Sequence, residues 1–176
     1  MSNRIYMHFG PLVFTIALAT GLQTPGQQQP KKPDSSMTRE SMEEMNKRGD
    51  RVMGFDHMQT THHFLLARDG GVIQVESNDA NDKESGDQIR SHLRHIAMMF
   101  SDGNFNAPML VHAQNPPGVE VLKQLKAEIT YKFEQTKHGG RVRITTSNGE
   151  AIKAIHEFLR FQIKEHDTRD SLEVVK

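Results

Sequence analysis

The feature that most constrains the fold is a strand–strand–helix pattern that occurs twice in the chain. In its first copy, strands at 60–66 and 72–76 flank Asp69-Gly70-Gly71, and glycine supplies the positive φ angles of a tight hairpin turn. A helix over 87–100 follows, because four apolar residues recur there at helical spacing: Ile89, Leu93, Ile96 and Phe100. The first copy is therefore a β-hairpin followed by an amphipathic helix.

The second copy has the same order. Strands at 127–135 and 141–146 flank Gly139-Gly140, and a helix then runs from Asn148 to about His166. Four antiparallel strands with both helices on one face bury one core and leave the other face in water. We therefore predict an α+β domain in which two strand–strand–helix pseudo-repeats form a four-stranded antiparallel sheet with helices on one face. The connector at 101–126 is expected to be extended at 108–112 and to form a short helix after Pro117.

The chain ahead of the first strand has the pattern of an exported protein. Residues 1–19 combine a basic residue, an apolar run and the small-x-small motif Ala17-Leu18-Ala19, which predicts a signal peptide cleaved after Ala19. The Gln- and Pro-rich sequence that follows predicts a disordered linker over 20–53, with a short helix at 37–48 ended by Gly49. The domain then covers 54–170, and 171–176 form a flexible tail. We expect a periplasmic or secreted protein with no stable membrane anchor after cleavage.

Composition narrows the chemistry. The 22 basic and 22 acidic residues balance, whereas a nucleic-acid partner normally requires a basic excess, so no nucleic acid is expected. The chain has no cysteine, which excludes disulfides, thiolate metal sites and cysteine nucleophiles. The chain has ten histidines and ten methionines, which is many for this length. Among its side chains, these are the best suited to bind a metal ion or a small ligand.

Several of these side chains are predicted to converge on the first helix. With a turn at Gly70-Gly71 that sets Asp69 opposite Val72, His62 falls on the core face of its strand. Two histidines one helical turn apart can reach one metal ion, and the connector must pass near them. Imidazole suits copper and thioether suits its reduced form, so copper is the first candidate, and zinc or haem could also use the histidines. The candidate metal ligands are His62, His92, His95, His112 and Met99.

The remaining histidines are interpreted differently. His156 lies on the apolar stripe of the last helix, where a hydrogen-bonded core histidine is expected. His57, His138 and His166 are expected to be loop or terminal residues.

Two alternatives to metal or small-ligand binding stay open. One is a non-catalytic interaction or structural module that pairs with a second copy or another protein through its sheet. The other is a small-molecule enzyme with a pocket between the first helix and the connector at 108–117. The sequence has no Gly-x-Ser-x-Gly, no phosphate-binding loop and no His-Glu-x-x-His, so whether the chain is an enzyme stays open as well.

Four short blocks, at 60–64, 91–97, 108–112 and 156–162, carry a resemblance. In these blocks the chain resembles a family of small exported bacterial proteins with no established activity, over about Gly54 to Asp170. Some relatives carry the automatic label aspartate carbamoyltransferase. That label does not transfer, because the domain is too short for that two-domain enzyme and the Ser-Thr-Arg-Thr-Arg carbamoyl-phosphate loop is missing. The resemblance therefore implies the limits of the domain and leaves its activity open.

Overall fold

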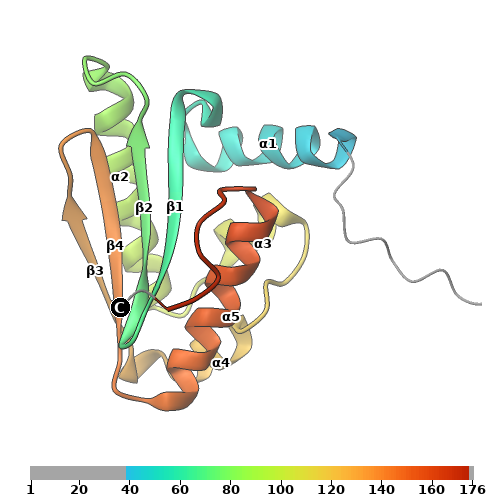
Figure 1. The fold of residues 1–176 in the computed structure, drawn as a ribbon, viewed down its shortest axis with the longest axis vertical. Helices are drawn as coiled ribbons and strands as arrows, with labels where there is room; N and C mark the ends of the chain where they lie inside the picture. Colours follow the sequence, from blue (N-terminus) through green and yellow to red (C-terminus); the bar gives the residue numbers. More distant parts are fainter. Residues whose placement is uncertain (1–38, 175–176) are drawn as a thin grey trace, which may run out of the picture. The chain divides into compact units, whose positions relative to one another are not determined.

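The computed structural model describes residues 39–174, and the predicted signal peptide lies outside this range. Its centre is a four-stranded antiparallel sheet with the strand order β1-β2-β4-β3 (Figure 1). The strands are β1 (Thr60–Ala67), β2 (Gly70–Ser77), β3 (Thr130–Gln135) and β4 (Gly139–Thr145). Each hairpin is followed by a long helix, α2 (Lys83–Ser101) or α5 (Gly149–Glu165). The predicted α+β fold with two β-hairpin–helix units is confirmed.

The hairpin turns differ from the prediction. Ala67 pairs with Gly70, so the first turn is Arg68–Asp69 and the glycines already belong to β2. The prediction that Gly70-Gly71 form the turn and set Asp69 opposite Val72 is wrong. The face assignment still holds, because the true register differs by an even number of residues: His62 lies opposite Val75.

The glycines are required by close packing between strands and helices. A Cβ on Gly70, whose φ is +141°, would lie 2.2 Å from the Ile144 carbonyl oxygen of β4. A Cβ on Gly71 would lie 2.2 Å from Cδ1 of Leu159 in α5. A side chain at either position would push β2 away from β4 or from α5, which explains the double glycine better than turn chemistry does.

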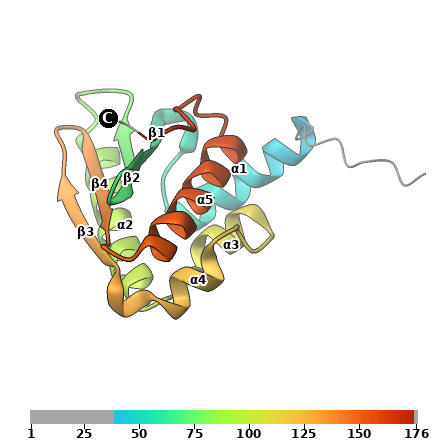
Figure 2. The ribbon, with the colours of Figure 1, turned by 60° about the horizontal axis from the view of Figure 1, so that its bottom comes forward.

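The two helices are exchanged between the hairpins. Helix α2 follows the β1–β2 hairpin but packs chiefly on β4 and β3, whereas α5 follows β3–β4 and packs on β1 and β2. Both lie on the same face of the sheet (Figure 2). Each helix starts with a side-chain cap, Asp82 on the Ser85 N–H of α2 and Asn148 on two N–H groups of α5. The crossing merges the two units into one core.

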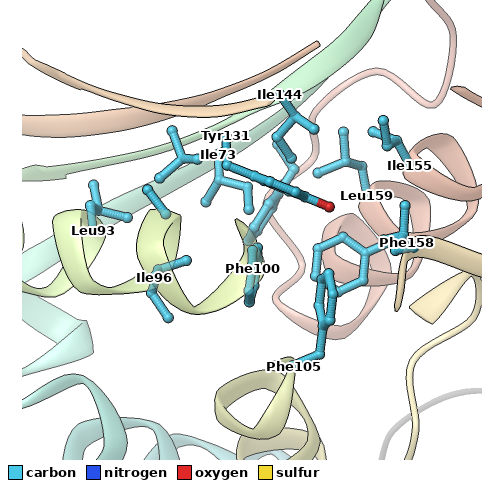
Figure 3. Packing of buried hydrophobic residues seen from close by; sticks show 14 of the residues in the cluster. Ile73, Leu93, Ile96, Phe100, Phe105, Tyr131, Ile144, Ile155, Phe158 and Leu159 are labelled. Carbon is cyan, nitrogen blue, oxygen red and sulfur yellow. The ribbon is translucent and has the colours of Figure 1, made fainter. Parts of the chain in front are cut away.

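The core contains an aromatic group between the sheet and the helices (Figure 3). Phe100 stacks on Phe105 with ring centroids 4.3 Å apart, and Tyr131 and Phe158 meet Phe100 edge-on. His156 is also buried and donates through Nε2 to the carbonyl oxygens of Ala67 and Gly70, which ties α5 to the first hairpin. The interpretation of His156 as a hydrogen-bonded core histidine is confirmed.

The segments around this core contain more helix than expected. Residues 108–112, predicted to be extended, belong to helix α3 (Asn106–His112), and a short helix α4 (Val119–Gln124) follows Pro117 as predicted. Two 3₁₀ turns, η1 (His57–Gln59) and η2 (Lys126–Glu128), precede β1 and β3.

Helix α1 (Arg39–Met53) occupies part of the segment that was predicted to be a linker. It continues through Gly49, so the predicted helix end there is wrong. The helix packs on α3, and Met45 is only 3% exposed. Of the predicted tail, Leu172 accepts a hydrogen bond from Arg160 and Val174 packs against the core. Within residues 39–174, no helix has the length and hydropathy needed to cross a membrane.

Candidate functional site

Four histidines from different parts of the fold come together beside α1. His57 lies in η1, His62 in β1, His112 at the end of α3 and His166 directly after α5. The rings of His62 and His166 are stacked with centroids 5.6 Å apart, and the ring of His112 meets His166 edge-on at 5.0 Å. His57 lies close enough to His62 and His166 to disfavour their protonated forms. We call these four residues the histidine cluster.

Two hollows meet at the histidine cluster. An inner cavity of about 80 Å³ lies between the sheet, α2 and α3, and its lining is mostly apolar. An outer groove of about 330 Å³ lies beside α1. Met53, His62, Val111 and His166 line both the inner cavity and the outer groove, so these four residues mark where the two hollows join. An inner cavity of this size has room for a few water molecules or one small ligand.

The imidazoles of the inner cavity are neutral at physiological pH. Burial, and secondarily the neighbouring histidines, lowers the pKa of His62 from 6.5 to about 4. Burial lowers the pKa of His92 to about 4 in the same way, with His95 adding to the effect. The pKa of His112 is also lowered by burial, and that of His166 falls well below its usual value. Uncharged imidazoles retain a free lone pair, so they can accept a hydrogen bond or bind a metal ion.

His112 has one ring nitrogen in a hydrogen bond and the other beside a carboxylate. Its Nε2 donates to Gln162 Oε1 at 3.0 Å, since an amide oxygen can only accept. Its Nδ1 therefore carries the lone pair and makes no hydrogen bond among the described residues, but it lies 3.7 Å from Oε2 of Glu165. The Gln162 Nε2 is buried and makes no hydrogen bond there either. Native proteins pair nearly all buried polar atoms with protein groups, water or a ligand, so these atoms are available to a water molecule or a ligand.

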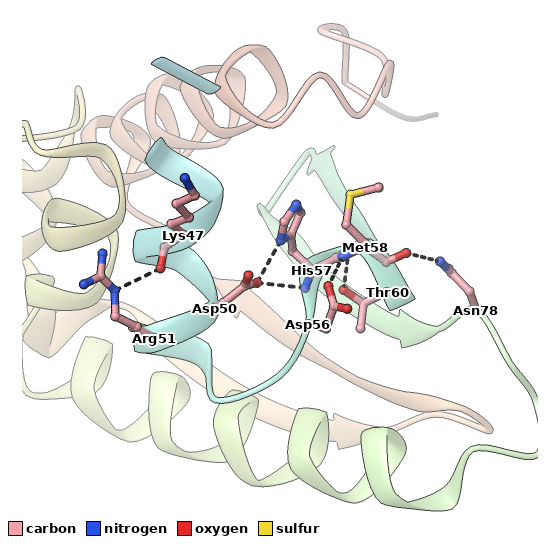
Figure 4. Close-up of polar contacts among 8 residues, drawn as sticks. All are labelled: Lys47, Asp50, Arg51, Asp56, His57, Met58, Thr60 and Asn78. Carbon is pink, nitrogen blue, oxygen red and sulfur yellow. Dashed lines mark hydrogen bonds and ion pairs between the residues drawn. The ribbon is translucent and has the colours of Figure 1, made fainter. Parts of the chain in front are cut away.

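His57 repeats this arrangement on the side of the outer groove. Its Nδ1 donates to Asp50 Oδ1 at 2.8 Å, and its backbone N–H donates to the same oxygen at 2.9 Å (Figure 4). In the neutral tautomer that donates from Nδ1 to the carboxylate, the lone pair is on Nε2. That Nε2 is buried and has no partner within the described part of the chain. Two members of the histidine cluster thus have one ring nitrogen held by a hydrogen bond and a second that makes none within the described residues.

A closer group of polar atoms lies next to the histidine cluster. Asp50, Asp56 and His57 offer ligand atoms within 4.8 Å of one another, and within residues 39–174 no other group of three His, Asp or Glu is that compact. Both carboxylates already have structural partners. Asp50 holds His57, and Asp56 caps η1 by accepting from the Met58 N–H at 2.8 Å. These carboxylates therefore serve chiefly to position His57.

The predicted ligands are brought together only in part. His62, His92 and His112 all line the inner cavity, which lies beside the first long helix. His95 is exposed and shares a shallow outer hollow with His92, whereas Met99 packs against the core. Neither His95 nor Met99 lines the inner cavity.

Two members of the histidine cluster were missed by the sequence analysis. His57 and His166 were interpreted as loop or terminal residues, yet both line the outer groove, and His166 lines the inner cavity as well. His166 follows Gln162 by one helical turn, which puts it on the face of α5 that meets His112. The four-residue spacing between Gln162 and His166 was the one sequence signal that could have placed His166 in the histidine cluster. For His57, only the fold of α1 against the domain shows its position.

Comparison with protein-family models, curated proteins and solved structures finds no match to this chain. The description of the site therefore rests on the geometry of its own residues.

Proposed function

We propose that this protein binds a soft transition-metal ion, with copper(I) as the preferred ion, at the histidine cluster. The observation that carries the proposal is the state of His57 and His112. In each, one ring nitrogen donates to a side-chain oxygen, Asp50 Oδ1 or Gln162 Oε1, and the other is buried and makes no hydrogen bond among the described residues, although the His112 Nδ1 lies 3.7 Å from Glu165 Oε2. Histidines that bind metals are typically held in this way, because the outer hydrogen bond fixes the tautomer and orients the lone pair.

The donor set favours a soft ion. The residues that line both hollows offer two imidazoles and the thioether of Met53. Imidazole and thioether suit copper(I), whereas calcium and magnesium require several oxygen ligands. Burial keeps these imidazoles unprotonated, so protons compete weakly with the metal at neutral pH.

The ring separations are compatible with a shared ion. A metal–nitrogen distance of about 2 Å allows the centroids of two imidazoles on one ion to lie up to roughly 6 Å apart. The separations of 5.0 Å for His112–His166 and 5.6 Å for His62–His166 fall within this limit. The rings of His62 and His166 are stacked at an interplanar angle of 7°, so their in-plane lone pairs do not meet at one point, and binding requires rotation of the rings toward the ion.

The proposal includes the periplasmic or secreted location that the sequence predicts. An exported protein would meet metal ions outside the cytoplasm, and a chain without cysteine offers no thiol to oxidise there. Imidazole and thioether ligands would remain available in that setting.

The small-molecule enzyme remains a second candidate because of one observation. The Asp50–His57 pair resembles a general base oriented by a carboxylate, and its free Nε2 belongs to a residue that lines the outer groove. Within the described residues, no hydroxyl or amine hydrogen-bonds to that Nε2. Metal binding therefore explains more of the features of the histidine cluster than an enzymatic reaction with a nucleophile does.

The test is a titration of the purified full chain with copper(I), buffered by a coloured competing chelator. The wild-type chain and His95→Gln, the exposed control, are expected to bind equally well. His112→Gln and His166→Gln should weaken binding at least roughly 10–100-fold, the range seen even for outer-shell changes. Binding should also raise the melting temperature, since a ligand present at about 100 times its Kd adds about 2.7 kcal/mol of stability. No copper binding and no thermal shift with copper or zinc would refute the proposal.

A further inference from the structure

Helix α1 presents a stripe of methionine side chains to the outer groove. Met42, Met45 and Met53 line it together with Asn46 and Gly49, and this spacing places all five on one face of the helix. A fourth thioether, Met58, lines the groove from η1 and is 68% exposed. Of the methionines in the described chain, these four line the groove.

The two ends of the stripe differ in position. Met53 also lines the inner cavity, where it shares the wall with His62 and His166. Met42, Met45 and Met58 line the outer groove and not the inner cavity. The stripe therefore extends from the histidine cluster to a part of the groove where thioethers are the main soft donors.

Methionine is often only a flexible filler of hydrophobic cores. Here Met42 and Met58 border about 330 Å³ of open space, and Met45 borders it with a side chain that is only 3% exposed. Met53 and Met99 both pack against the core, and of these two only Met53 also lines the groove. The carboxylates of Glu165 and Asp167 also line the groove, and their negative charge favours a cation over an apolar ligand.

We infer that Met42, Met45 and Met58 form a second soft-metal site, which binds copper(I) and exchanges it with the histidine cluster through Met53. The exchange part of this inference rests on the function proposed for the histidine cluster. Each step forms one copper–sulfur or copper–nitrogen bond as another breaks. The ion stays monovalent throughout, so no oxidant or reductant is consumed.

The chemistry of the three donors sets their selectivity. Thioethers are neutral, soft and not protonated in water, so they select monovalent copper or silver and bind zinc poorly. Met42 and Met45 are three residues apart on the helix, with Cβ atoms about 5–6 Å apart, and their long side chains can reach one ion. Met58, which lines the same groove from η1, supplies the third sulfur.

The experiment counts bound ions on the purified full chain with two metals. Silver(I), a redox-stable substitute for copper(I), can occupy both sites, whereas zinc reports the histidine cluster alone. We expect two silver ions and one zinc ion per wild-type chain. The variant Met42→Leu/Met45→Leu/Met58→Leu should bind one silver and one zinc. The matched control Met98→Leu/Met109→Leu changes methionines outside the groove and should keep both silver ions.

A second measurement protects the test against a variant that folds poorly. X-ray absorption of the wild-type chain loaded with two equivalents of copper(I) should show sulfur neighbours of the metal, and the triple variant should have fewer of them. One silver ion per wild-type chain, or two in the triple variant, would overturn the inference. Failure of the histidine site looks different: zinc does not bind, and His112→Gln leaves the silver count unchanged.

Discussion

Acidification should destabilise the metal-free protein well above the pH at which carboxylates titrate. The reason is the burial of neutral imidazoles on the wall of the inner cavity. His62 is faced by His92 of α2, by His57 of η1, by His166 and by its own strand neighbour His63, so a proton on its ring is opposed from several sides. In the unfolded chain each of these imidazoles would titrate near its usual pKa of about 6.5.

The size of the effect follows from the difference between folded and unfolded pKa values. A fall in pKa from 6.5 to about 4 for His62 corresponds to about 3 kcal/mol of stability, and His92 has the same folded pKa. Between pH 4 and pH 6.5 the unfolded state binds more protons than the folded state, so the free energy of unfolding rises with pH. The stabilisation is fully present above pH 6.5 and is lost as the pH falls to about 4. The two imidazoles together give a slope of roughly 2–3 kcal/mol per pH unit.

The assay is urea unfolding at a series of pH values from 7.5 to 4.5, with a chelator present to remove metals. The His62→Gln variant should show a flatter dependence of unfolding free energy on pH than the wild type. His95→Gln changes an exposed imidazole and should leave the slope unchanged. Since a typical domain has only about 5–15 kcal/mol of stability, the wild type should approach unfolding near pH 4.5. Equal slopes for wild type and His62→Gln between pH 6.5 and pH 5 would refute this reasoning.

Two further predictions concern single residues. Gly71→Ala places a Cβ 2.2 Å from Leu159 Cδ1 and 2.8 Å from the Leu65 carbonyl oxygen, so it should cost at least about 1–3 kcal/mol, measured as a loss of unfolding free energy in urea. Gly149→Ala, where a Cβ would meet nothing within 4 Å, is the control, and an equal loss there would contradict the packing argument. Asp50→Asn removes the carboxylate that orients His57 and should weaken copper(I) binding about 10–100-fold in the chelator titration, and unchanged affinity would place His57 outside the metal site.

The fold was predictable because its signals are local. The apolar stripes of the two long helices and the alternation in the strands lie within short windows, and the repeat of the whole unit supported the assignment. The position of the first hairpin turn was predicted wrongly because glycine can serve two structural roles. It supplies positive φ angles, which the sequence analysis assumed, and it also permits close approach, which Gly71 needs against α5. The face of β1 was still predicted correctly, because it depends only on whether the register error is an even or an odd number of residues.

The candidate site was predictable only where its residues lie on the core faces of regular elements. His62 and His92 were found in this way, and both line the inner cavity. His57 and His166 lie outside the strands and long helices and are far apart in sequence, so periodicity gave no information on their contact. Met99 has the same helical spacing as the two histidines of α2, but the helix turns it toward the core.

The exchange of helices between the two hairpins also indicates how a single strand–strand–helix unit would behave on its own. A single strand–strand–helix unit would leave its own hairpin uncovered, because α5 packs on the first hairpin and α2 chiefly on the second. Two separate copies of such a unit could satisfy each other, with each helix lying across the partner's strands. The present chain then corresponds to a two-fold, helix-swapped dimer joined by the connector, and residues 101–126 convert an association between molecules into an intramolecular one.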